Sequence, residues 1–588
     1  MERLLKRTKI VCTIGPACED KDTIRKMIES GMNVARLNFS HGNHEEHKKR
    51  IDIIREVSGE LGVYIAILLD TKGPEIRTKK FDKDEIYLKE GETFTITTRD
   101  IVGSDEISSV TYEGLADDVS VGDRILVDDG LICLEVENIE GTEIVCQVKN
   151  SGTIKNNKGI NIPGVAINLP SITDKDKEDI LFAIKNNVDF IAVSFVRKRQ
   201  DIMEIKRILE ENNTNDIDII AKIENQEGVD NLLEIIQISE GVMVARGDLG
   251  VEIPPEEIPL IQKRIIRECN SVGKPVITAT QMLDSMMRNP RPTRAEVTDV
   301  ASAIFDGTDA IMLSGETAAG KYPVESVITM ATIAKKTEAS LDYQKILKQK
   351  SREKNTTITD AISQATYRSA EDLGAKSIFA ATSSGYTAKM ISKFRPIVPI
   401  VATTSSEKVA RKMALVWGIT PMVIDNLKDI SDIFEDSKKK ALEEGFIEYG
   451  DLIVLTAGVP VGISGSTNML RVDVVSKILI KGIGIGSRHA VGHVCIVSNA
   501  KEAEEKMKKG DILVSHGTDS DMVPYMKKAS ALIVEEAGLT CHTAIVGLNL
   551  NIPTIVGAEN ATTILKDGMC ITVDTAAGII YKGRATII

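Results

Sequence analysis

The stretch Tyr64-Ile-Ala-Ile-Leu-Leu-Asp70-Thr71-Lys72 is an unbroken apolar run that ends in polar residues. Continuous apolar strands are typical of a parallel sheet, because such a sheet is buried on both faces. Seven similar runs occur in the first 320 residues, with helical patterns between them. These runs are Thr8–Gly15, Met32–Ser40, Phe190–Phe195, Ile217–Glu224, Gly241–Arg246, Pro275–Thr280 and Asp309–Gly315. Eight strands that alternate with helices predict an α/β fold, a closed (β/α)8 TIM barrel.

Polar or charged residues stand at the carboxyl end of six of these runs. The segments are Arg36–His41, Asp70–Lys72, Lys222–Asn225, Arg246–Asp248, Thr280–Gln281 and Ser314–Glu316. In a barrel of this type, chemistry gathers at the carboxyl ends of the strands. A purely structural barrel has no reason to place so many polar groups on one rim, so the pattern predicts a site there.

An insertion separates the third run from the fourth, because Asp70 and Phe190 are 120 positions apart. The interval contains short alternating segments, with turn signals at residues 121–123, 128–130, 140–142 and 163–164. This pattern predicts an all-β insertion, a small β-barrel, after the third strand. Two roles stay open for it: a lid that excludes water from the site, and a passive insertion.

Further domains follow the barrel. Leu341–Asn355 is polar and lysine-rich and predicts a helical connector. A second α/β pattern runs from Thr356 to about Val475, with apolar runs at Ser377–Ala381, Ile397–Ala402 and Leu452–Thr456. The glycine-rich residues 481–486 predict a linker. The predicted domains are 1–72 with 171–345 (barrel), 73–170 (lid), 346–475 (second α/β domain) and 487–588 (last domain).

Composition narrows the class of protein. Of 588 residues, 42% are apolar and 27% are charged, which is typical of a soluble globular protein. The net charge of −13 argues against nucleic acid or an anionic membrane as the main partner. No apolar run approaches the roughly 18 residues of a membrane helix, and the charged N-terminus does not resemble a signal peptide. Eight scattered cysteines without a CxxC pair predict reduced thiols, a cytoplasmic location and no zinc site.

Two carboxylates, Glu224 and Asp248, follow neighbouring strands of the predicted barrel. Together with substrate oxygens they could hold Mg²⁺ or Mn²⁺. The alternative is a salt bridge from either acid to Arg246 or Lys222. Lys222 lies two positions before Glu224, so both side chains point to the same face of the strand.

Cations and neutral oxygens surround this pair on the rim. Lys222, Arg36 and Arg77 could form an electrostatic clamp for a phosphoryl group in transfer. A second, weaker signal is a set of oxygen donors with a single carboxylate, which suits a monovalent cation better than a divalent one. This set consists of Asn38, Ser40, Asp70 and Thr71.

At this point several long motifs resemble the pyruvate kinase family, over residues 1 to about 475. They are Met32–Gly42, Leu69–Arg77, Lys222–Asn225, Ala245–Gly250, Ala279–Leu283 and Met312–Thr317. The resemblance implies an allosterically regulated glycolytic enzyme that transfers the phosphoryl group of phosphoenolpyruvate to ADP, giving pyruvate and ATP. It also implies a homotetramer, a feature that the sequence itself does not show.

The resemblance also implies roles for individual residues. Catalytic roles fall on Lys222, Arg36, Arg77 and Thr280, and substrate contacts on Arg36, Gly247, Asp248 and Thr280. The implied nucleotide-binding residues are Asn38, His41, Arg77 and Lys158. The implied K⁺ ligands are Asn38, Ser40, Asp70 and Thr71, and Glu224 and Asp248 are implied for Mg²⁺ or Mn²⁺.

Glu75 predicts K⁺ dependence, since family members that require K⁺ carry Glu at this position and K⁺-independent ones carry Lys. After phosphoryl transfer an enolate has to be protonated to pyruvate. The sequence leaves the proton donor open between Thr280, acting through water, and the Lys222 ammonium.

Three histidines, His41, His44 and His47, have a spacing that also invites a metal interpretation. Positions three apart share a helix face, but positions six apart do not. We therefore expect His41 beside the nucleotide, as the family implies, and the other two in solvent.

In the second α/β domain, a loop rich in hydroxyl groups follows a predicted strand and opens a helix. Its residues are Thr382, Ser383, Ser384, Gly385 and Thr387. Alone it would be an ordinary capped helix start, but it aligns with the family's effector loop, which binds a sugar phosphate. Tyr386 departs from relatives activated by fructose bisphosphate and favours a monophosphate such as AMP or ribose 5-phosphate. The identity and sign of the effector stay open.

The last segment resembles the swivelling phosphohistidine domain of phosphoenolpyruvate-utilising enzymes, through Glu535–Val546 and Asn551–Gly557. A subset of bacterial pyruvate kinases, chiefly Bacillus-like ones, carries such a domain. His542 falls on the phosphorylated histidine, but Cys541 replaces the usual Ser, and Gly547-Leu548 stands where an Arg is usual. These departures favour a structural or regulatory module over a working phosphohistidine.

Two other interpretations of the whole chain remain as alternatives. A dikinase-like phosphotransferase working through phosphorylated His542 would need a further nucleotide-binding domain, and no segment is left to supply one. A catalytically dead sugar-phosphate sensor is disfavoured because every implied catalytic position is intact.

Overall fold

The computed structural model describes the chain except residues 1–5, 166, 351–356, 426–428, 461–464 and 585–588. Its internal contacts divide it into two compact units. The first consists of Met1–Lys354, Ser384–Arg395 and Ser406–Val423, and the second of Asn355–Ser383, Pro396–Ser405 and Ile424–Ile588. No helix among the described residues is long and apolar enough to cross a membrane.

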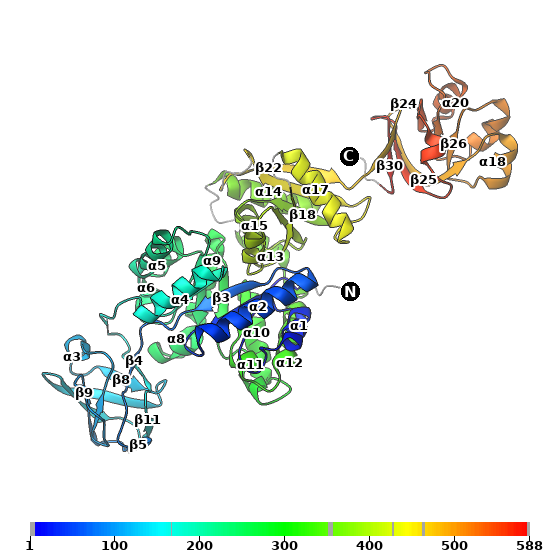
Figure 1. The fold of residues 1–588 in the computed structure, drawn as a ribbon. Helices are drawn as coiled ribbons and strands as arrows, with labels where there is room; N and C mark the ends of the chain where they lie inside the picture. Colours follow the sequence, from blue (N-terminus) through cyan, green and yellow to red (C-terminus); the bar gives the residue numbers. More distant parts are fainter. Residues whose placement is uncertain (1–5, 166, 351–356, 426–428, 461–464, 585–588) are drawn as a thin grey trace. The chain divides into compact units, whose positions relative to one another are not determined.

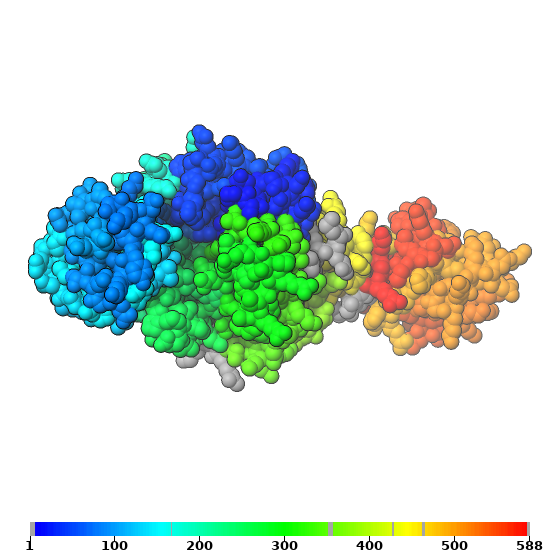
Figure 2. All heavy atoms as spheres, turned by 90° about the horizontal axis from the view of Figure 1, so that it is seen from below, coloured from blue at the N-terminus to red at the C-terminus, as the bar shows by residue number. Residues whose placement is uncertain are grey.

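Eight parallel strands close into a barrel in the first unit (Figure 1). They are β1 (Lys9–Thr13), β2 (Val34–Asn38), β3 (Ala66–Asp70), β13 (Phe190–Val193), β14 (Asp218–Ile223), β15 (Gly241–Ala245), β16 (Val276–Ala279) and β17 (Ala310–Leu313). Each predicted apolar run contains one of these strands, so the prediction of a (β/α)8 barrel is confirmed. The barrel closes where β1 pairs with β17, with Lys9 opposite Ala310. In Figure 2 the dark blue N-terminal segment accordingly lies against the green segment that ends the barrel.

Helices cover the outside of the barrel. They are α1 (Lys21–Ser30), α2 (His44–Leu61), α4 (Asp174–Lys185), α5 (Arg199–Glu211), α6 (Gln226–Asp230), α7 (Leu232–Ile238), α8 (Arg246–Glu252), α9 (Ile258–Val272), α10 (Arg294–Asp306), α11 (Gly315–Ala318) and α12 (Pro323–Glu338), with a short 3₁₀ helix at Asp284–Met287. Several begin at a side-chain cap that accepts a hydrogen bond from the first turn. Asn43 caps α2, and Thr173 and Thr293 form capping boxes on α4 and α10.

The insertion after β3 is all-β, as predicted. A curled sheet has the strand order β4-β12-β8-β9-β10-β6-β7, and β5 pairs separately with β11. The elements are β4 (Ile76–Arg77), β5 (Glu85–Leu88), β6 (Thr93–Thr97), β7 (Ile107–Ser109), α3 (Leu115–Asp118), β8 (Arg124–Val127), β9 (Ile132–Glu140), β10 (Glu143–Val148), β11 (Gly152–Lys155) and β12 (Gly159–Asn161). Alternate residues such as Ile144, Cys146 and Val148 fill its core.

The first unit also contains α13 (Tyr343–Lys350), α15 (Tyr386–Ser392), α16 (Glu407–Met413) and β20 (Ile419–Val423). Helix α13 lies in the predicted connector. Cations from the later segments form ion pairs with acids at the amino ends of three barrel strands. The pairs are Arg395–Asp309 at 2.8 Å, Arg411–Asp189 at 2.8 Å and Lys412–Asp218 at 2.6 Å.

The second unit begins with an α/β domain. Strands β19 (Ile400–Thr404), β18 (Ser377–Ala381) and β21 (Leu452–Gly458) are parallel neighbours in that order, and β22 (Thr467–Val474) is antiparallel to β21. Helices α14 (Ile358–Asp372) and α17 (Ile430–Glu443) belong to the same domain. The three predicted apolar runs of this domain each overlap one of its parallel strands: the run Ser377–Ala381 coincides with β18, whereas β19 and β21 each extend two residues beyond their runs.

The last domain is built on a sheet with the order β23-β30-β29-β25-β26-β27-β28-β24. The strands are β23 (Ile478–Lys481), β24 (Ile483–Ile485), β25 (His489–Ile496), β26 (Ile512–Ser515), β27 (Ala531–Val534), β28 (Thr554–Val556), β29 (Cys570–Asp574) and β30 (Ile579–Lys582). The helices are α18 (Ala500–Lys506), α19 (Val523–Met526), α20 (His542–Leu550) and α21 (Ala561–Ile564), with a 3₁₀ turn at Ser520–Met522.

The prediction of a glycine-rich linker at 481–486 is wrong. These residues contribute to β23 and β24, which pair with β30 and β28 in the sheet. Their glycines allow close packing: a Cβ on Gly482 would lie 2.6 Å from Ile555 Cγ2, and one on Gly484 would lie 1.8 Å from the Thr575 carbonyl oxygen. A run of glycines in a strand marks close approach as well as flexibility, and the sequence pattern alone did not separate the two.

Candidate active site

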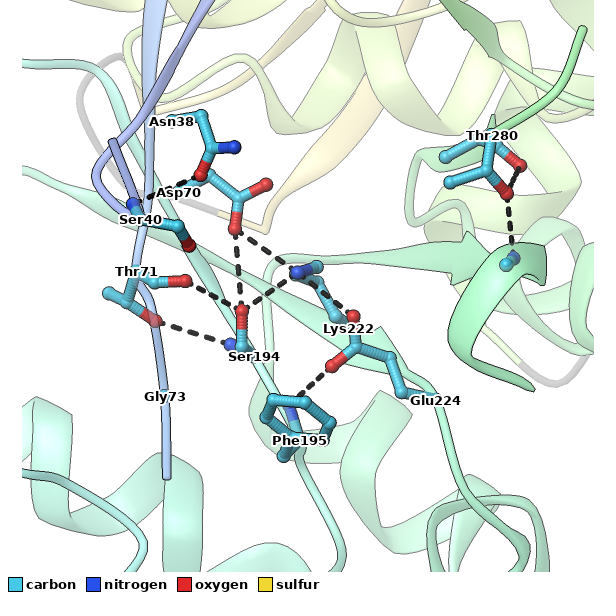
Figure 3. Close-up of polar contacts among 12 residues, drawn as sticks. Asn38, Ser40, Asp70, Thr71, Gly73, Ser194, Phe195, Lys222, Glu224 and Thr280 are labelled. Carbon is cyan, nitrogen blue, oxygen red and sulfur yellow. Dashed lines mark hydrogen bonds and ion pairs between the residues drawn. The ribbon is translucent and has the colours of Figure 1, made fainter. Parts of the chain in front are cut away.

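The predicted K⁺ ligands lie together at the carboxyl ends of β2 and β3 (Figure 3). Asn38 and Asp70 are the last residues of these strands and stand opposite each other in the register. The Ser40 amide donates to Asn38 Oδ1 at 3.1 Å, and the Phe39 amide donates to the Asp70 carbonyl at 3.0 Å. Thr71 follows directly. The structure therefore collects amide, hydroxyl, carboxylate and carbonyl oxygens, a donor set that fits a hard monovalent cation.

Lys222 is at the centre of the rim and is buried. Its Nζ lies 2.9 Å from Glu224 Oε1, 3.2 Å from Asp70 Oδ1 and 2.7 Å from Ser194 Oγ (Figure 3). Burial by itself lowers the pKa of Lys222, but Asp70 and Glu224 raise it by more, so the pKa lies above its ordinary value. The ammonium is therefore held charged at the centre of the rim.

Asp70 joins Lys222 to Arg36. Arg36 Nε donates to Asp70 Oδ2 at 2.6 Å, and Arg36 Nη1 donates to Thr13 Oγ1 at 2.9 Å. Burial raises the pKa of Asp70, but Arg36 and Lys222 outweigh it and hold that pKa below its usual range. Two of the three predicted clamp cations thus share one buried carboxylate.

Ser194, the residue directly after β13, also belongs to this cluster and was not predicted from the sequence. The Ser194 hydroxyl accepts a hydrogen bond from the Lys222 ammonium and donates one to the Thr71 carbonyl at 2.7 Å. The Ser194 amide donates to Thr71 Oγ1 at 3.2 Å. The next amide, that of Phe195, donates to Glu224 Oε2 at 2.6 Å. The available signal was its position at the end of the fourth apolar run, where no charge drew attention to it.

Glu224 and Asp248 follow the neighbouring strands β14 and β15, as predicted. Burial, with the nearby Asp248 charge, raises the pKa of Glu224 to about 7 against the opposing effect of Lys222. Burial also raises the pKa of Asp248. Because both pKa values are raised, the two carboxylates do not readily carry negative charge side by side. A divalent cation between them would stabilise both charges, so this donor set fits such an ion. Among the described residues no group of three His, Cys, Asp or Glu is arranged to hold a metal, so the remaining ligands would be substrate and water oxygens.

The salt-bridge alternative is right for Lys222, which contacts Glu224, and wrong for Arg246. Arg246 instead binds Asp299 at 2.7 Å and donates to the Thr280 carbonyl at 2.7 Å. Thr280 has a φ of 67°, and its hydroxyl accepts from the Gly247 amide at 2.8 Å. Thr280 and Gly247 are therefore brought together, and Figure 3 shows Thr280 apart from the Lys222 cluster.

A cleft of about 490 Å³ lies beside these groups, lined by both lid and barrel. Arg77 and Lys158 line it from the lid and Asp248 from the barrel. Arg77 Nε binds Glu75 Oε2 at 2.6 Å, and Lys158 Nζ binds Asp128 Oδ1 at 2.9 Å. Two of the four predicted nucleotide residues thus share the cleft. Asn38 and His41, the other two, are not among its lining residues.

The three histidines do not converge. His44 Nε2 lies 2.6 Å from Asp179 Oδ1, whereas His47 Nε2 lies 2.9 Å from the His41 carbonyl oxygen. The expectation that His47 is solvated is wrong: it is buried and stacks on Phe39 with ring centroids 4.0 Å apart. Burial lowers its pKa to about 4. Its helix turns it inward over Phe39, a contact that spacing alone does not reveal.

Comparison with known proteins agrees with this geometry. Residues 5–327 match the barrel domain of pyruvate kinase, residues 360–473 its alpha/beta domain, and residues 507–578 the mobile domain of PEP-utilising enzymes. The chain belongs to the pyruvate kinase family. It is 56% identical over 586 residues to the pyruvate kinase of Bacillus licheniformis, a match that covers 99% of this chain and 100% of the relative.

The pyruvate kinase of Geobacillus stearothermophilus is 55% identical over 585 residues, with the same coverage. Among solved structures, a pyruvate kinase from Cryptosporidium parvum is similar with a TM-score of 0.78 and 41% identity, over 81% of this chain and 98% of that one. The first two relatives match the last domain as well as the barrel, so the enzyme is a pyruvate kinase with a C-terminal mobile domain.

The predicted effector loop of this pyruvate kinase connects β18 to α15. Gly385 has a φ of 83°, in the left-handed region that favours glycine, and it caps α15. Thr382 and Thr387 are buried, whereas Ser383 and Ser384 are exposed. Two serines of the loop are therefore at the surface.

His542 is the first residue of α20 in the mobile domain. Thr518 Oγ1 lies 2.8 Å from His542 Nδ1 and 2.8 Å from Thr543 Oγ1. A second histidine, His516, contacts Glu535 at 2.8 Å. Thr518 orients the His542 imidazole through its contact with Nδ1, and this contact was not predicted from the sequence.

Proposed function

We propose that this pyruvate kinase transfers the phosphoryl group of phosphoenolpyruvate directly to ADP at the rim around Lys222. The observation that carries the proposal is the buried network in which one ammonium contacts Asp70, Glu224 and Ser194. Phosphoryl transfer needs positioning and charge neutralisation more than a covalent nucleophile. In this proposal Lys222 stabilises the phosphoryl group in transfer, Arg36 binds its oxygens, and Arg77 and Lys158 bind the nucleotide phosphates in the cleft.

Glu224 and Asp248 would hold Mg²⁺ or Mn²⁺, and Asn38, Ser40, Asp70 and Thr71 would hold K⁺. The divalent ion, when bound, supplies positive charge to the enolate and phosphate oxygens. The protein's own part is to keep these carboxylates buried and oriented. The Phe195 amide fixes one oxygen of Glu224, and Arg36 fixes one oxygen of Asp70. Glu75 Oε2 lies 2.6 Å from Arg77 Nε and 3.8 Å from Lys72 Nζ. The Glu75 carboxylate therefore offsets positive charge beside the proposed site, which supports a requirement for the charge of K⁺.

Thr280 and the Gly247 and Asp248 amides are proposed on the substrate side. The Gly247 amide already donates to Thr280 Oγ1, so substrate binding there exchanges one acceptor for another. Proton delivery to the enolate is proposed for Thr280 through water, and Lys222 is the competing donor. A Thr280→Val variant that still protonates the enolate at the normal rate would assign the step to Lys222.

A phosphorylated metabolite, a monophosphate such as AMP or a sugar phosphate, is the proposed effector at Thr382, Ser383, Ser384, Gly385 and Thr387. Exposure of Ser383 and Ser384 supports this.

We further propose a cytoplasmic homotetramer. Phe305 on α10 and Ile328 on the adjacent α12 are 56% and 49% exposed, which leaves an apolar face for a second subunit. Loss of the tetramer in Phe305→Glu by sedimentation would support that interface.

The proposed domain limits are those predicted from the sequence, except that the last domain starts at β23.

Within the last domain, we propose that His542 is accessory, that is, not needed for phosphoryl transfer. The specific observation for the alternative, a phosphohistidine relay, is the orientation of the ring by Thr518. The test is ADP-dependent pyruvate formation from phosphoenolpyruvate, with and without K⁺, for the full chain and for His542→Ala. Activity that needs K⁺ and survives the substitution supports direct transfer, and loss of turnover with the fold intact would favour the relay.

A further inference from the structure

Helix α4 begins where the chain returns from the lid to the barrel. Its cap, Thr173, forms a capping box with Asp176. Gly73, by contrast, lies where the chain leaves the barrel for the lid, three residues beyond the end of β3. The Gly73 amide donates to Asp176 Oδ1 at 3.1 Å. One buried carboxylate, 2% exposed, therefore holds both chain connections of the lid.

Other residues of α4 contact the end of β2 and the start of α2. Lys175 Nζ donates to the Phe39 carbonyl at 2.7 Å. One turn further along the helix, Asp179 Oδ1 contacts His44 Nε2 at 2.6 Å, and two turns along, Phe182 packs against the Phe39 ring at 5.5 Å. Residues four and seven positions apart share one face of a helix. This face thus fixes the β2–α2 loop at three points.

These attachments flank the proposed K⁺ ligands on both strands. Phe39 lies between Asn38 and Ser40 in the chain, and Gly73 lies two residues after Thr71. Figure 3 shows Gly73 on the segment that continues from Thr71. None of the attachments uses a ligand side chain. The α4 contacts instead hold the backbone on either side of the ligands, and together with the β2–β3 pairing they restrain how far apart the donor oxygens of the two strands stand.

We propose that Asp176 and Lys175 are positioning residues for K⁺. They hold the two ligand-bearing segments at the spacing that the ion needs, without touching it. This inference rests on the proposed K⁺ site. Groups that orient metal ligands from behind commonly change metal affinity by 10- to 100-fold when they are removed.

A simpler explanation is that Asp176 only caps its helix. Thr173→Ala separates the two roles, because it removes the side-chain cap on the Asp176 amide and leaves the Asp176–Gly73 contact in place. Lys177→Gln is the matched control on the outer face of α4, where the Lys177–Asp174 pair is exposed. A second explanation is pure electrostatics, and Lys175→Met tests it. Loss of a cation should tighten K⁺ binding if charge alone matters, but should weaken it if Lys175 positions Phe39.

The experiment titrates K⁺ against the purified full-length protein without substrates and follows the rise in melting temperature, with tetramethylammonium at equal ionic strength as the reference. The half-saturating K⁺ concentration for activity is measured in parallel. For Asp176→Asn and Lys175→Met we expect both half-saturation values to rise about tenfold, with Thr173→Ala and Lys177→Gln close to wild type.

Unchanged K⁺ values in Asp176→Asn, or tighter K⁺ binding in Lys175→Met, would overturn the inference. An effect of Thr173→Ala equal to that of Asp176→Asn would also overturn it, in favour of capping alone. A wild-type protein that shows no K⁺ response in either measurement would instead remove the proposed K⁺ site itself, so the two failures are distinguishable.

Discussion

Buried charges occur at both ends of the barrel, and the two ends treat them differently. At the amino end, Asp189, Asp218 and Asp309 each meet an arginine or lysine of the protein. At the carboxyl end, Asp70 binds both Arg36 and Lys222, but Glu224 shares Lys222 with Asp70. Burial and the nearby Asp248 raise the pKa of Glu224 to about 7, and burial raises the pKa of Asp248. The amino end is neutralised by the chain itself, whereas the carboxyl end leaves carboxylates short of positive charge.

This difference separates structural from functional ion pairs in one fold. A complete pair contributes to stability, and breaking it strands a buried charge. Two buried carboxylates with too few neighbouring cations lower the stability of the fold until a cation binds to them. Groups of this kind cluster at active sites. Variants at the two ends should therefore divide between activity and stability.

The largest effect is expected for Lys222→Met. Removal of the central ammonium should lower kcat by about 10³-fold, because charge stabilisation of the transferring group is lost. The melting temperature should change little, since Asp70 keeps Arg36 and since Glu224, whose pKa is already raised to about 7, can take up a proton instead of staying charged without a partner. The measurement is steady-state pyruvate formation with saturating K⁺ and Mg²⁺. A kcat within tenfold of wild type would show that this end of the barrel is not the reacting centre.

The matching variant at the amino end is Arg395→Met. Asp309 would then be buried without its partner, and the free energy of unfolding should fall by about 3 kcal/mol or more, whereas kcat of the folded protein should stay near wild type. Denaturant unfolding of the barrel measures the first quantity. Restoration of most of the loss in Arg395→Met/Asp309→Asn would attribute it to the stranded charge, and no restoration would place it elsewhere.

A smaller effect, on cation dependence, is expected for Glu75→Lys. The new ammonium would supply a fixed positive charge beside Arg77 in place of the acid that now binds it at 2.6 Å. The stimulation of activity by K⁺ should fall by about tenfold, with turnover in K⁺-free buffer rising. Activity with and without K⁺ measures this, and Glu75→Gln is the control for loss of the acid alone. Unaltered stimulation would separate Glu75 from the K⁺ requirement.

The smallest expected effect concerns acid stability at the amino end. Burial raises the pKa of Asp218, but Lys389 and Lys412 outweigh it and hold the pKa below the ordinary value of 3.8. A lowered carboxyl pKa contributes stability that is present above pH 3.8 and is lost as the pH falls towards the folded-state value. Asp218→Asn should cost about 1–2 kcal/mol at neutral pH and unfold with a shallower pH dependence below pH 4. A parallel shift at all pH values would contradict the assignment.

Much of the barrel was predictable because its strands are uniformly apolar and its rim is polar. Both follow from local sequence, so the eight strands and the positions of Asp70, Lys222 and Glu224 emerged together. Ser194 did not emerge, because a single hydroxyl after a strand resembles any turn residue. The burial of His47 depends on Phe39, and the role of Asp176 on Gly73, which lies 103 residues away.

The same limit explains the error at residues 481–486. Glycine reports freedom of the backbone, but only the opposite strands show that Gly482 and Gly484 are there to admit neighbouring atoms. Local propensity predicts which helices and strands form. The contacts of an individual glycine, histidine or serine depend on residues that are distant in sequence, so they are not predicted in the same way.

The two strands that close the barrel, β1 and β17, are synthesised at widely separated times. Lys9 is made early on the ribosome, and its partner Ala310 follows 301 residues later. At about 5–20 residues per second the first strand waits on the order of 15–60 s for its neighbour. Over that interval one edge of the growing sheet is open, and an open apolar edge invites pairing with other chains. The lid, whose strands all pair within residues 76–161, is completed while this edge waits. A nascent chain of this enzyme therefore carries a finished lid domain beside an unclosed barrel for much of its synthesis.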